Sequence, residues 1–439
     1  MISMALEGIK VIDVSQVAAV PMCARHLADF GADVLHIENA ATGDSWRNLQ
    51  AGAGGGPAGI PSDLPYNWEA FNRNKRSVAI DLSREGGRKI IYRMVEKADV
   101  FLTNLRLIER NKFGLEYETL NTLNPRLIYG SVTGHGRHGP DKDMPAYDTT
   151  VFWARSGVSH LLTIPGMSGP NSRPAFGDNV AGLGLAFGVM AALFARDRLG
   201  VGQEIDTSLF FTGLYQLTFD VAAALATGRD EMEYRLEEAF EGTEEEREQR
   251  DVLIRESRTA IKRLADFYRE RLPNPMANTY ETWDGKWIRF NALQADRYWA
   301  KFCKLIGREE LEKDFRFATL EAREENRKEL YHIFREAFLI RSLEEWRPLI
   351  LDLPASPVQN LVEVINDPQV RANNFFLPYD HPTYGPMEIM ASPVNMSKTP
   401  ATIRMAAPEF SQHTEEVLLE EGYSWEDIER FKEEGVIPY

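Results

Sequence analysis

Residues 1–130 alternate between short apolar segments and segments with helical spacing. Residues 9–14 and 33–37 are short and rich in valine and isoleucine, which is typical of buried strands. Residues 21–30 lie between them, have helical spacing and end at Gly31, a residue type favoured directly after a helix. A strand, a helix and a second strand in this order pair in parallel, so we predict an α/β domain with an open, mostly parallel sheet.

The same alternation continues downstream. Residues 76–80, 99–103 and 126–129 have the composition of strands, and residues 85–97 have that of a helix. The first turn, residues 15–20, reads Ser-Gln-Val-Ala-Ala-Val and lacks the glycines with which dinucleotide-binding folds bring their backbone close to a pyrophosphate. We therefore predict the sheet of such a fold without an NAD cofactor.

A charged segment at residues 228–272 interrupts the pattern. Its apolar residues recur near helical spacing, so we predict a long, solvated amphipathic helix. Strand and helix signals then return, beginning with a strand at 287–290. We therefore predict a large α/β domain formed by residues 1–215 and 345–439, interrupted by a small α/β domain at 216–344 that contains the charged insertion.

The composition limits the partners of the protein. The 439 residues include 66 acidic and 50 basic side chains, and the net charge of −16 excludes nucleic acid as the main partner while it allows a small anion bound by a few local cations. The cysteines, Cys23 and Cys303, are too far apart in sequence for a disulfide framework or a zinc site. The N-terminus has no apolar signal segment, and the apolar residues 180–195 contain three glycines, which favours a buried helix over a membrane span. We expect a cytoplasmic protein that binds no membrane.

The best candidate for chemistry is the Gly177–Asp178 pair, directly before this apolar helix. A carboxylate at a helix N-terminus is kept ionised by free N–H groups and is able to attack an activated acyl group. The competing interpretation is an ordinary N-cap, which the local sequence alone favours. His135 and His138 lie in a glycine-rich loop without an acidic or cysteine partner at metal-binding spacing, so we predict no metal and interpret this loop as the lining of a ligand entrance.

Several segments, taken together and in order, carry a resemblance that no single one of them would. They are 6–14 (LEGIKVIDV), 27–38, 71–77 (FNRNKRS), 124–128, Tyr147–Asp148, Gly177–Asp178, 200–203, 367–369 and 413–417. With these segments the chain resembles the family III CoA-transferases, which include the formyl-CoA:oxalate and crotonobetainyl-CoA:carnitine enzymes. The likeness covers nearly the whole chain, and only the charged segment looks like an insertion.

The resemblance implies a function and a site. In that family the aspartate of the Gly-Asp pair attacks the acyl-CoA, so Asp178 is implied as the nucleophile, with a mixed anhydride and an aspartyl-CoA thioester as intermediates. The implied reaction moves CoA from an acyl-CoA, with succinyl-CoA as one candidate donor, to a free carboxylic acid. An interlocked homodimer, or a heteromer, is implied as well. The positions implied for CoA binding are Val17, Ala18, Asn104, Leu105, Lys112, Phe113, Tyr147 and Asp148.

Two departures from the family pattern bear on the alternatives. Asn39 stands where some members carry an arginine, so the contacts to the CoA phosphates must differ. Tyr147 stands where a related racemase branch has its histidine, and a phenol is a poor base at neutral pH, which disfavours racemisation. An acyl-CoA racemase, an intramolecular CoA-transfer isomerase and a non-catalytic subunit of a heteromer remain as alternatives. The aromatic residues at 280–299 favour a bulky or aromatic acid as the acceptor.

Overall fold

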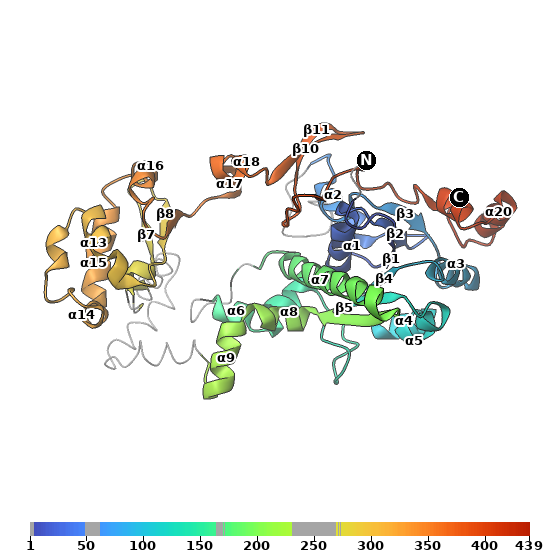
Figure 1. Cartoon of the computed structure of the whole chain (residues 1–439), viewed down its shortest axis with the longest axis horizontal. Helices are drawn as coiled ribbons and strands as arrows, with labels where there is room; N and C mark the ends of the chain where they lie inside the picture. Colours follow the sequence, from blue (N-terminus) through green and yellow to red (C-terminus); the bar gives the residue numbers. More distant parts are fainter. Residues whose placement is uncertain are drawn as a thin grey trace. The chain divides into compact units, whose positions relative to one another are not determined.

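The computed structural model describes residues 4–48, 62–163, 170, 172–230, 269–270, 272 and 274–439. The chain divides into two compact units (Figure 1): unit 1 contains most of the residues up to 225 and those from 372 onward, and unit 2 contains residues 226–371. The predicted charged helix at 228–272 lies for the most part outside the described residues.

The boundaries between the two units, at 225/226 and 371/372, differ from the predicted domain boundaries, 215 and 345. Residues 345–371 belong to unit 2, because the short strand β9 (Ala355–Pro357) pairs with a strand of that unit. The sequence around Pro357 has no strand-like alternation of polar and apolar residues, so this pairing could not be seen in it.

Unit 1 is built on a six-stranded sheet in which all neighbouring strands are parallel. The strands are β1 (Lys10–Val14), β2 (Asp33–Glu38), β3 (Arg76–Ala79), β4 (Val100–Thr103), β5 (Ile128–Thr133) and β6 (Gln203–Ser208). Their order, β3-β2-β1-β4-β5-β6, changes direction between β1 and β4. In open parallel sheets the carboxyl ends of the strands at such a reversal form the crevice that binds ligands.

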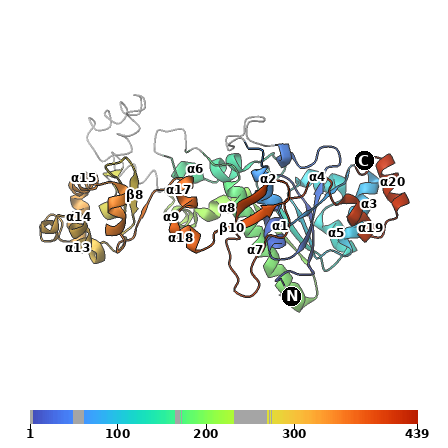
Figure 2. The same cartoon turned by 90° about the horizontal axis from the view of Figure 1, so that it is seen from above.

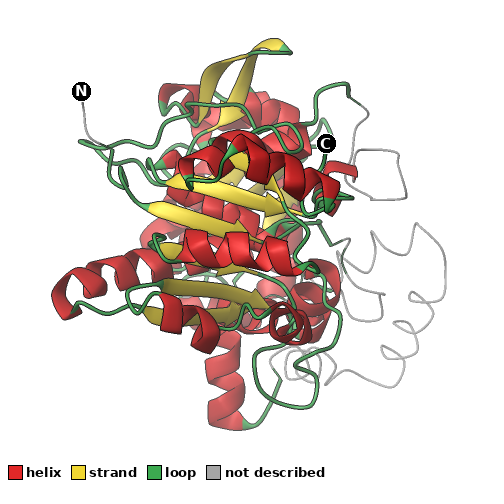
Figure 3. Cartoon of the chain, turned by 90° about the vertical axis from the view of Figure 1, so that its right-hand side faces the viewer, coloured by secondary structure: helices red, strands yellow, loops and turns green. Residues whose placement is uncertain are grey.

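Helices cover both faces of this sheet (Figures 2 and 3). Successive side chains of a strand point to opposite faces, so Val11 and Ile12 of β1 enter two different apolar clusters. Burial on both faces explains why the central strand β4, with the sequence VFLT, is almost continuously apolar. The helices are α1 (Ala19–Asp29) and α7 (Phe176–Leu199) on one face, and α3 (Glu85–Val95), α5 (Tyr117–Leu123), α19 (Thr414–Glu420) and α20 (Trp425–Glu433) on the other.

The remaining elements of unit 1 are short. They include the helices α2 (Tyr66–Asn72), α4 (Leu107–Phe113), α6 (Val158–Leu161), α8 (Leu209–Gln216) and α9 (Thr218–Thr227), a π-helical segment (Thr149–Arg155), and the antiparallel hairpin of β10 (Phe376–His381) and β11 (Gly385–Met390).

Helix α7 is apolar from Val180 to Ala195 but is buried along one side only. Ala181 and Leu185 pack in the core, and Gly182 lets α1 approach closely, because a β-carbon there would lie 2.5 Å from the carbonyl oxygen of Ala19. On the other side Phe187 is 77% exposed. Among the described helices α7 alone is, by length and composition, able to span a bilayer, while the bent pair of α8 and α9 passes that test only jointly. The predicted burial therefore holds for one side of the helix.

Unit 2 has an antiparallel three-stranded sheet and helices around an aromatic core. Tyr280 stacks on Phe338 with 5.1 Å between the ring centroids. Tyr280 and Trp299, two of the aromatic residues that favour a bulky or aromatic acceptor acid, are buried in this core, whereas Trp283 is exposed. The elements are β7 (Thr279–Glu281), β8 (Trp287–Phe290), β9, α13 (Ala295–Leu305), α14 (Leu320–Glu325), α15 (Arg327–Phe338), α16 (Leu343–Trp346), α17 (Leu361–Ile365) and α18 (Pro368–Ala372).

Candidate functional site

A cavity of about 480 Å³ opens in unit 1 at the carboxyl ends of β1, β4 and β5, where the strand order changes direction. Its walls come from the loops that follow these strands, from the first turn of α7 and from the start of α8. This is the size and the position expected of a site for a small organic ligand.

Seven of the nine residues selected from the sequence line this cavity: Val17, Ala18, Asn104, Leu105, Tyr147, Asp148 and Asp178. The other two, Lys112 and Phe113, are not among the lining residues. They lie at the end of α4, where the ammonium group of Lys112 is 5.4 Å from the centroid of the Phe113 ring and Phe113 packs against the core. The role predicted for this pair in CoA binding stays a prediction.

The cavity lining also contains polar residues that were not selected from the sequence, among them Gln16, Arg106, Glu109 and Lys142. Arg106 directly follows the predicted Asn104–Leu105 pair, so its place after a strand was a usable signal. Lys142 follows the glycine-rich loop at 133–140, which was expected to line a ligand entrance, and Thr133 and Gly134 of that loop line the cavity.

The histidines of the glycine-rich loop do not line the cavity. His135 instead lies with its Nδ1 atom 3.0 Å from the guanidinium group of Arg155. Among the described residues there is no group of three or more His, Cys, Asp or Glu side chains that could hold a metal ion.

Asp178 lies in the first turn of α7, but it does not cap that helix. The N-cap position is Ala175, and the carboxylate of Asp148 accepts a hydrogen bond from the Gly177 N–H at 2.9 Å. The expectation that Asp178 serves as an ordinary N-cap is therefore wrong, because Asp148 supplies this contact from a different segment. The Asp178 side chain is left free to line the cavity.

Gly177 is the residue that makes this arrangement possible. A β-carbon at this position would collide with the ring of Phe152 and with the Asp148 carboxylate. Only glycine therefore allows the Asp148 side chain to approach the start of α7 closely enough to bond its backbone.

Both carboxyl groups bind protons more tightly than ordinary aspartates do. Burial raises the pKa of Asp178 to about 7, and the negative charge of Asp148 acts in the same direction. Burial also raises the pKa of Asp148 to about 6, against the hydrogen bond from the Gly177 N–H, which lowers it. Two interacting carboxyls whose pKa values lie near neutrality, in one cavity, are typical of a site for acid–base or nucleophilic chemistry.

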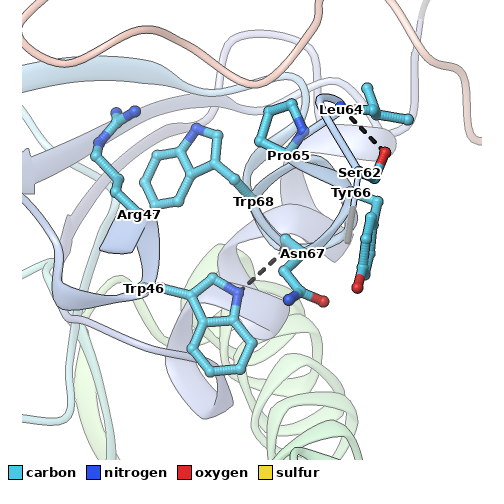
Figure 4. A pocket seen from close by; sticks show the side chains of 8 residues that line it. All are labelled: Trp46, Arg47, Ser62, Leu64, Pro65, Tyr66, Asn67 and Trp68. Carbon is cyan, nitrogen blue, oxygen red and sulfur yellow. Dashed lines mark hydrogen bonds between the residues drawn. The ribbon is translucent and has the colours of Figure 1, made fainter. Parts of the chain in front are cut away.

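A second, much smaller hollow of about 10 Å³ is lined by Trp46, Arg47, Ser62 and residues 64–68 (Figure 4). The Arg47 guanidinium is stacked on the Trp68 ring at 3.8 Å and bonded to the Glu38 carboxylate, so it is already engaged. This hollow has room for about one water molecule and lacks the paired carboxyls of the larger cavity.

Neither cysteine belongs to the cavity lining. Cys23 and Cys303 are both free and fully buried, and burial raises the pKa of the Cys303 thiol to about 12. The reactive groups of the candidate site are therefore carboxyls and not thiols.

The comparisons with known proteins agree with this site. The sequence model of CoA-transferase family III matches residues 6–241 and 261–414. The chain is 32% identical to (R)-2-hydroxy-4-methylpentanoate CoA-transferase of Clostridioides difficile, over 99% of this chain and 100% of the relative. It is 30% identical to cinnamoyl-CoA:phenyllactate CoA-transferase of Clostridium sporogenes, over 97% of this chain and 96% of the relative.

A solved structure shares the fold. The crystal structure of a CAIB/BAIF family protein from Brucella suis has a TM-score of 0.75 and 28% sequence identity, and the match covers 95% of this chain and 100% of that one. Because the family model and the relatives match nearly the whole chain, the resemblance predicted from short segments is confirmed. The chain belongs to CoA-transferase family III and is an enzyme that transfers coenzyme A.

Proposed function

We propose that this enzyme moves CoA from an acyl-CoA to a free 2-hydroxy carboxylic acid, with Asp178 as the covalent carrier. The observation that carries the proposal is the place of the Asp178 carboxyl, which lines the cavity from the first turn of a 24-residue helix. The positive end of a helix dipole favours an anion there, but burial outweighs it and raises the pKa of Asp178 to about 7, so part of the carboxyl groups is ionised at neutral pH. Two relatives are named for the acids 2-hydroxy-4-methylpentanoate and phenyllactate, which supports a 2-hydroxy acid with an apolar side chain as the acceptor.

The reaction balances without water or an external proton. The Asp178 carboxylate attacks the thioester carbonyl, the C–S bond breaks, and a mixed anhydride and the CoA thiolate form. The thiolate attacks the Asp178 carbonyl carbon, which releases the donor acid and leaves an aspartyl-CoA thioester. The acceptor carboxylate repeats the two exchanges in reverse, so the new acyl-CoA departs and the Asp178 carboxylate returns.

The surroundings of Asp178 suit these steps. Val17, Ala18, Val132 and Leu209 give the cavity apolar walls, which keep water from an anhydride that it would hydrolyse. A pKa raised by burial makes the Asp178 carboxylate a more basic nucleophile than an exposed aspartate once it is ionised.

The cations of the lining suit anionic parts of the substrates. Lys142 is exposed at the cavity, where it is able to attract a CoA phosphate or the acceptor carboxylate. Arg106 is exposed there as well, but its guanidinium group is paired with the Glu109 carboxylate at 3.0 Å. Asn104 has a different role, because both ends of its side-chain amide are bonded to the backbone of Gln16, at 3.0 and 2.7 Å. We infer that Asn104 fixes a cavity wall.

The covalent step is tested by trapping. The enzyme is incubated with an acyl-CoA and hydroxylamine, and peptide mass mapping is expected to find a hydroxamate at Asp178. Asp178→Ala is expected to lower the rate of transfer about 1,000-fold or more. The matched control is Asp197→Asn, which removes an exposed carboxylate from the last turn of the same helix and is expected to leave the rate unchanged. Full activity of Asp178→Ala would exclude the mechanism.

A second assay separates the transferase from its alternatives. The enzyme is incubated with one 2-hydroxyacyl-CoA and no free acid. We expect the acyl-CoA to keep its configuration and its connectivity, and CoA transfer to begin when the acid is added. A racemised or rearranged product without acceptor would favour the racemase or the isomerase. Tyr147, which stands where the racemase branch has its histidine, lines the cavity and is exposed.

We propose further that the enzyme acts as a homodimer. The outer side of α7 carries an apolar stripe formed by Leu183, Phe187, Met190 and Phe194, which are 44%, 77%, 39% and 60% exposed. A stripe of this kind on a soluble protein marks a surface that another chain covers. Family likeness points to a second copy of this chain, interlocked with the first. Localisation in the cytoplasm is proposed with it, on the composition alone.

The dimer is tested by light scattering. The wild-type protein is expected to have twice the mass of one chain, and Phe187→Glu combined with Phe194→Glu is expected to give single chains. The control is Phe187→Leu, which keeps an apolar side chain and should keep the dimer. A wild-type protein that is monomeric at micromolar concentration would contradict the proposal, and mass recovered only with a different chain would indicate a heteromer.

A further inference from the structure

Val17, in the wall of the cavity, has a backbone conformation that valine rarely adopts. Its φ angle is +69°, in the left-handed region, and it lies in the loop between β1 and α1. For a β-branched residue this conformation is strained and persists only where neighbouring groups enforce it. The contacts around Val17 therefore decide the shape of this wall.

Two side chains hold the loop from opposite directions. The Val17 N–H donates to both carboxylate oxygens of Asp44, at 3.1 and 3.3 Å. The backbone of Gln16, one residue earlier, is bonded to the amide of Asn104 through both its N–H and its carbonyl oxygen. Asp44 is 2% exposed, so its hydrogen bond to Val17 is shielded from water.

Asp44 is in turn held by a buried imidazolium. Nε2 of His36 lies 3.2 Å from Oδ2 of Asp44, and Nδ1 lies 2.9 Å from Oδ2 of Asp13. Because both ring nitrogens face carboxylates, both donate and the ring is charged. Burial alone would lower the pKa of His36, but the charge of Asp13 and the hydrogen bonds to both carboxylates raise it to about 9. Lys75 completes the group, with its Nζ atom 3.1 Å from Oδ2 of Asp13.

The segment that carries Asp44 is fixed on its far side as well. The Trp46 N–H donates to Oδ1 of Asp44 at 2.8 Å, and its indole N–H donates to the carbonyl oxygen of Asn67 at 3.1 Å, as Figure 4 shows. The Asp44 N–H donates to the Glu38 carboxylate at 2.9 Å. Asp44 therefore cannot follow Val17 if the loop relaxes, and it acts as a fixed point.

The loop is also coupled to the start of α7. Val17 packs in one small apolar cluster with Ala18, Met22, Phe71 and Ala175. Ala175 is the N-cap of α7, three residues before Asp178, and it too has a left-handed φ of +60°. A change in the conformation of Val17 would therefore shift both the cavity wall and the position of the Asp178 carboxyl.

We propose that Asp13, His36 and Asp44 form a positioning relay that holds Val17 in its left-handed conformation and so fixes the cavity wall beside Asp178. The inference rests on the proposed function, since it takes this cavity as the place of acyl transfer. A buried group of charges gives little net stability compared with apolar packing, so its placement behind a strained cavity residue needs a reason beyond stability. None of the three relay residues needs to touch the substrate.

The test is a comparison of Asp44→Ala in three backgrounds that differ only at position 17. With Val17 present, Asp44→Ala is expected to lower kcat/KM about tenfold or more, because the left-handed conformation loses its anchor. In the Val17→Gly background the same change is expected to cost less than about threefold, since glycine adopts a positive φ unaided. Val17→Ala is the matched control: it also removes the side chain but still disfavours a positive φ, so Asp44→Ala should again cost about tenfold.

The outcomes separate this inference from the proposed function. If Asp178→Ala is active, the proposed function fails, whatever Asp44 does. If Asp178→Ala is inactive but Asp44→Ala costs the same factor in all three backgrounds, or costs nothing with Val17 present, the positioning role is refuted. Each rate is divided by the concentration of active sites, which is measured as the amount of hydroxamate formed at Asp178. This normalisation removes the effect of unfolded protein. Should Asp44→Ala not fold, Asp44→Asn replaces it, with an expected loss of about threefold that Val17→Gly cancels.

Discussion

The pH dependence of the reaction offers a direct test of the two-carboxyl site, through Asp148→Asn. In the wild-type protein the Gly177 N–H donates to Oδ1 of Asp148 at 2.9 Å. The asparagine keeps an oxygen that accepts this hydrogen bond, but it removes the negative charge. An anion at Asp178 then forms without a like charge nearby. The pKa of Asp178 must therefore fall, and the acid limb of the pH–rate profile must move to lower pH.

The size of this shift is bounded by the structure. The pKa of Asp178 rises from 3.8 to about 7, and burial contributes more than the charge of Asp148 does. Asp148 thus accounts for less than half of about three units, and we expect a fall of about one unit, or about 1.4 kcal/mol. At pH 6 this would raise the ionised fraction of Asp178 from about one tenth to about one half.

The assay is kcat/KM for the acyl-CoA between pH 5 and 9, with each profile normalised to its own plateau. The midpoint is expected near pH 7 in the wild type and about one unit lower in Asp148→Asn. Asp197→Asn, at the far end of α7, is the control that should not move it. A midpoint that stays in place or rises in Asp148→Asn would refute the account of the paired carboxyls.

Four further changes test other parts of the structure. Because the pKa of Asp178 is raised in the folded protein, ionisation of Asp178 lowers the stability of the fold as the pH rises from about 4 through about 7. Asp178→Asn should therefore raise the melting temperature more at pH 8 than at pH 5, and equal changes would contradict this. Gly177→Ala should lower kcat about 100-fold, because its β-carbon collides with Phe152 and Asp148, and a wild-type kcat would show that the helix start adapts. Lys142→Ala should raise the KM for acyl-CoA about three- to tenfold and weaken its dependence on salt, and an unchanged KM would remove Lys142 from the site. Trp346→Ala should destabilise unit 2 by about 3–5 kcal/mol in chemical denaturation, since its indole is fully buried and bonded to the carbonyl oxygen of Phe338, and a loss below about 1 kcal/mol would contradict that.

The parts of the fold that follow local rules were predicted well from the sequence. The segments 9–14 and 33–37 correspond to β1 and β2, and the helix between them ends at Asp29, two residues before Gly31, which has a positive φ of 107°. The first turn, residues 15–20, contains no glycine, and the residue with a left-handed φ in this turn is Val17. Such patterns are readable because each depends on residues close together in the chain.

The parts that were missed depend on contacts between distant residues. Asp148 bonds the start of α7 across 29 positions, and no local pattern distinguishes it from an ordinary loop aspartate. The relay from Asp13 to Asp44 joins residues of two strands and a turn, and these look unrelated until the sheet is formed. The outer side of α7 was expected to be buried in the core, but it is exposed. An apolar sequence alone does not distinguish a helix side that packs in the core from one that lies at the surface.

The burial of both cysteines has a consequence for the redox chemistry of the enzyme. The proposed cycle releases the CoA thiolate next to the protein at every turnover, and a thiolate exchanges readily with disulfides and oxidised thiols. Cys23 and Cys303 are fully buried, and burial raises the pKa of both thiols, so neither presents a thiolate to CoA or to an oxidant. An enzyme that handles a free thiol is in this way protected from forming mixed disulfides with its own substrate, and its activity should survive both oxidised CoA and alkylating reagents.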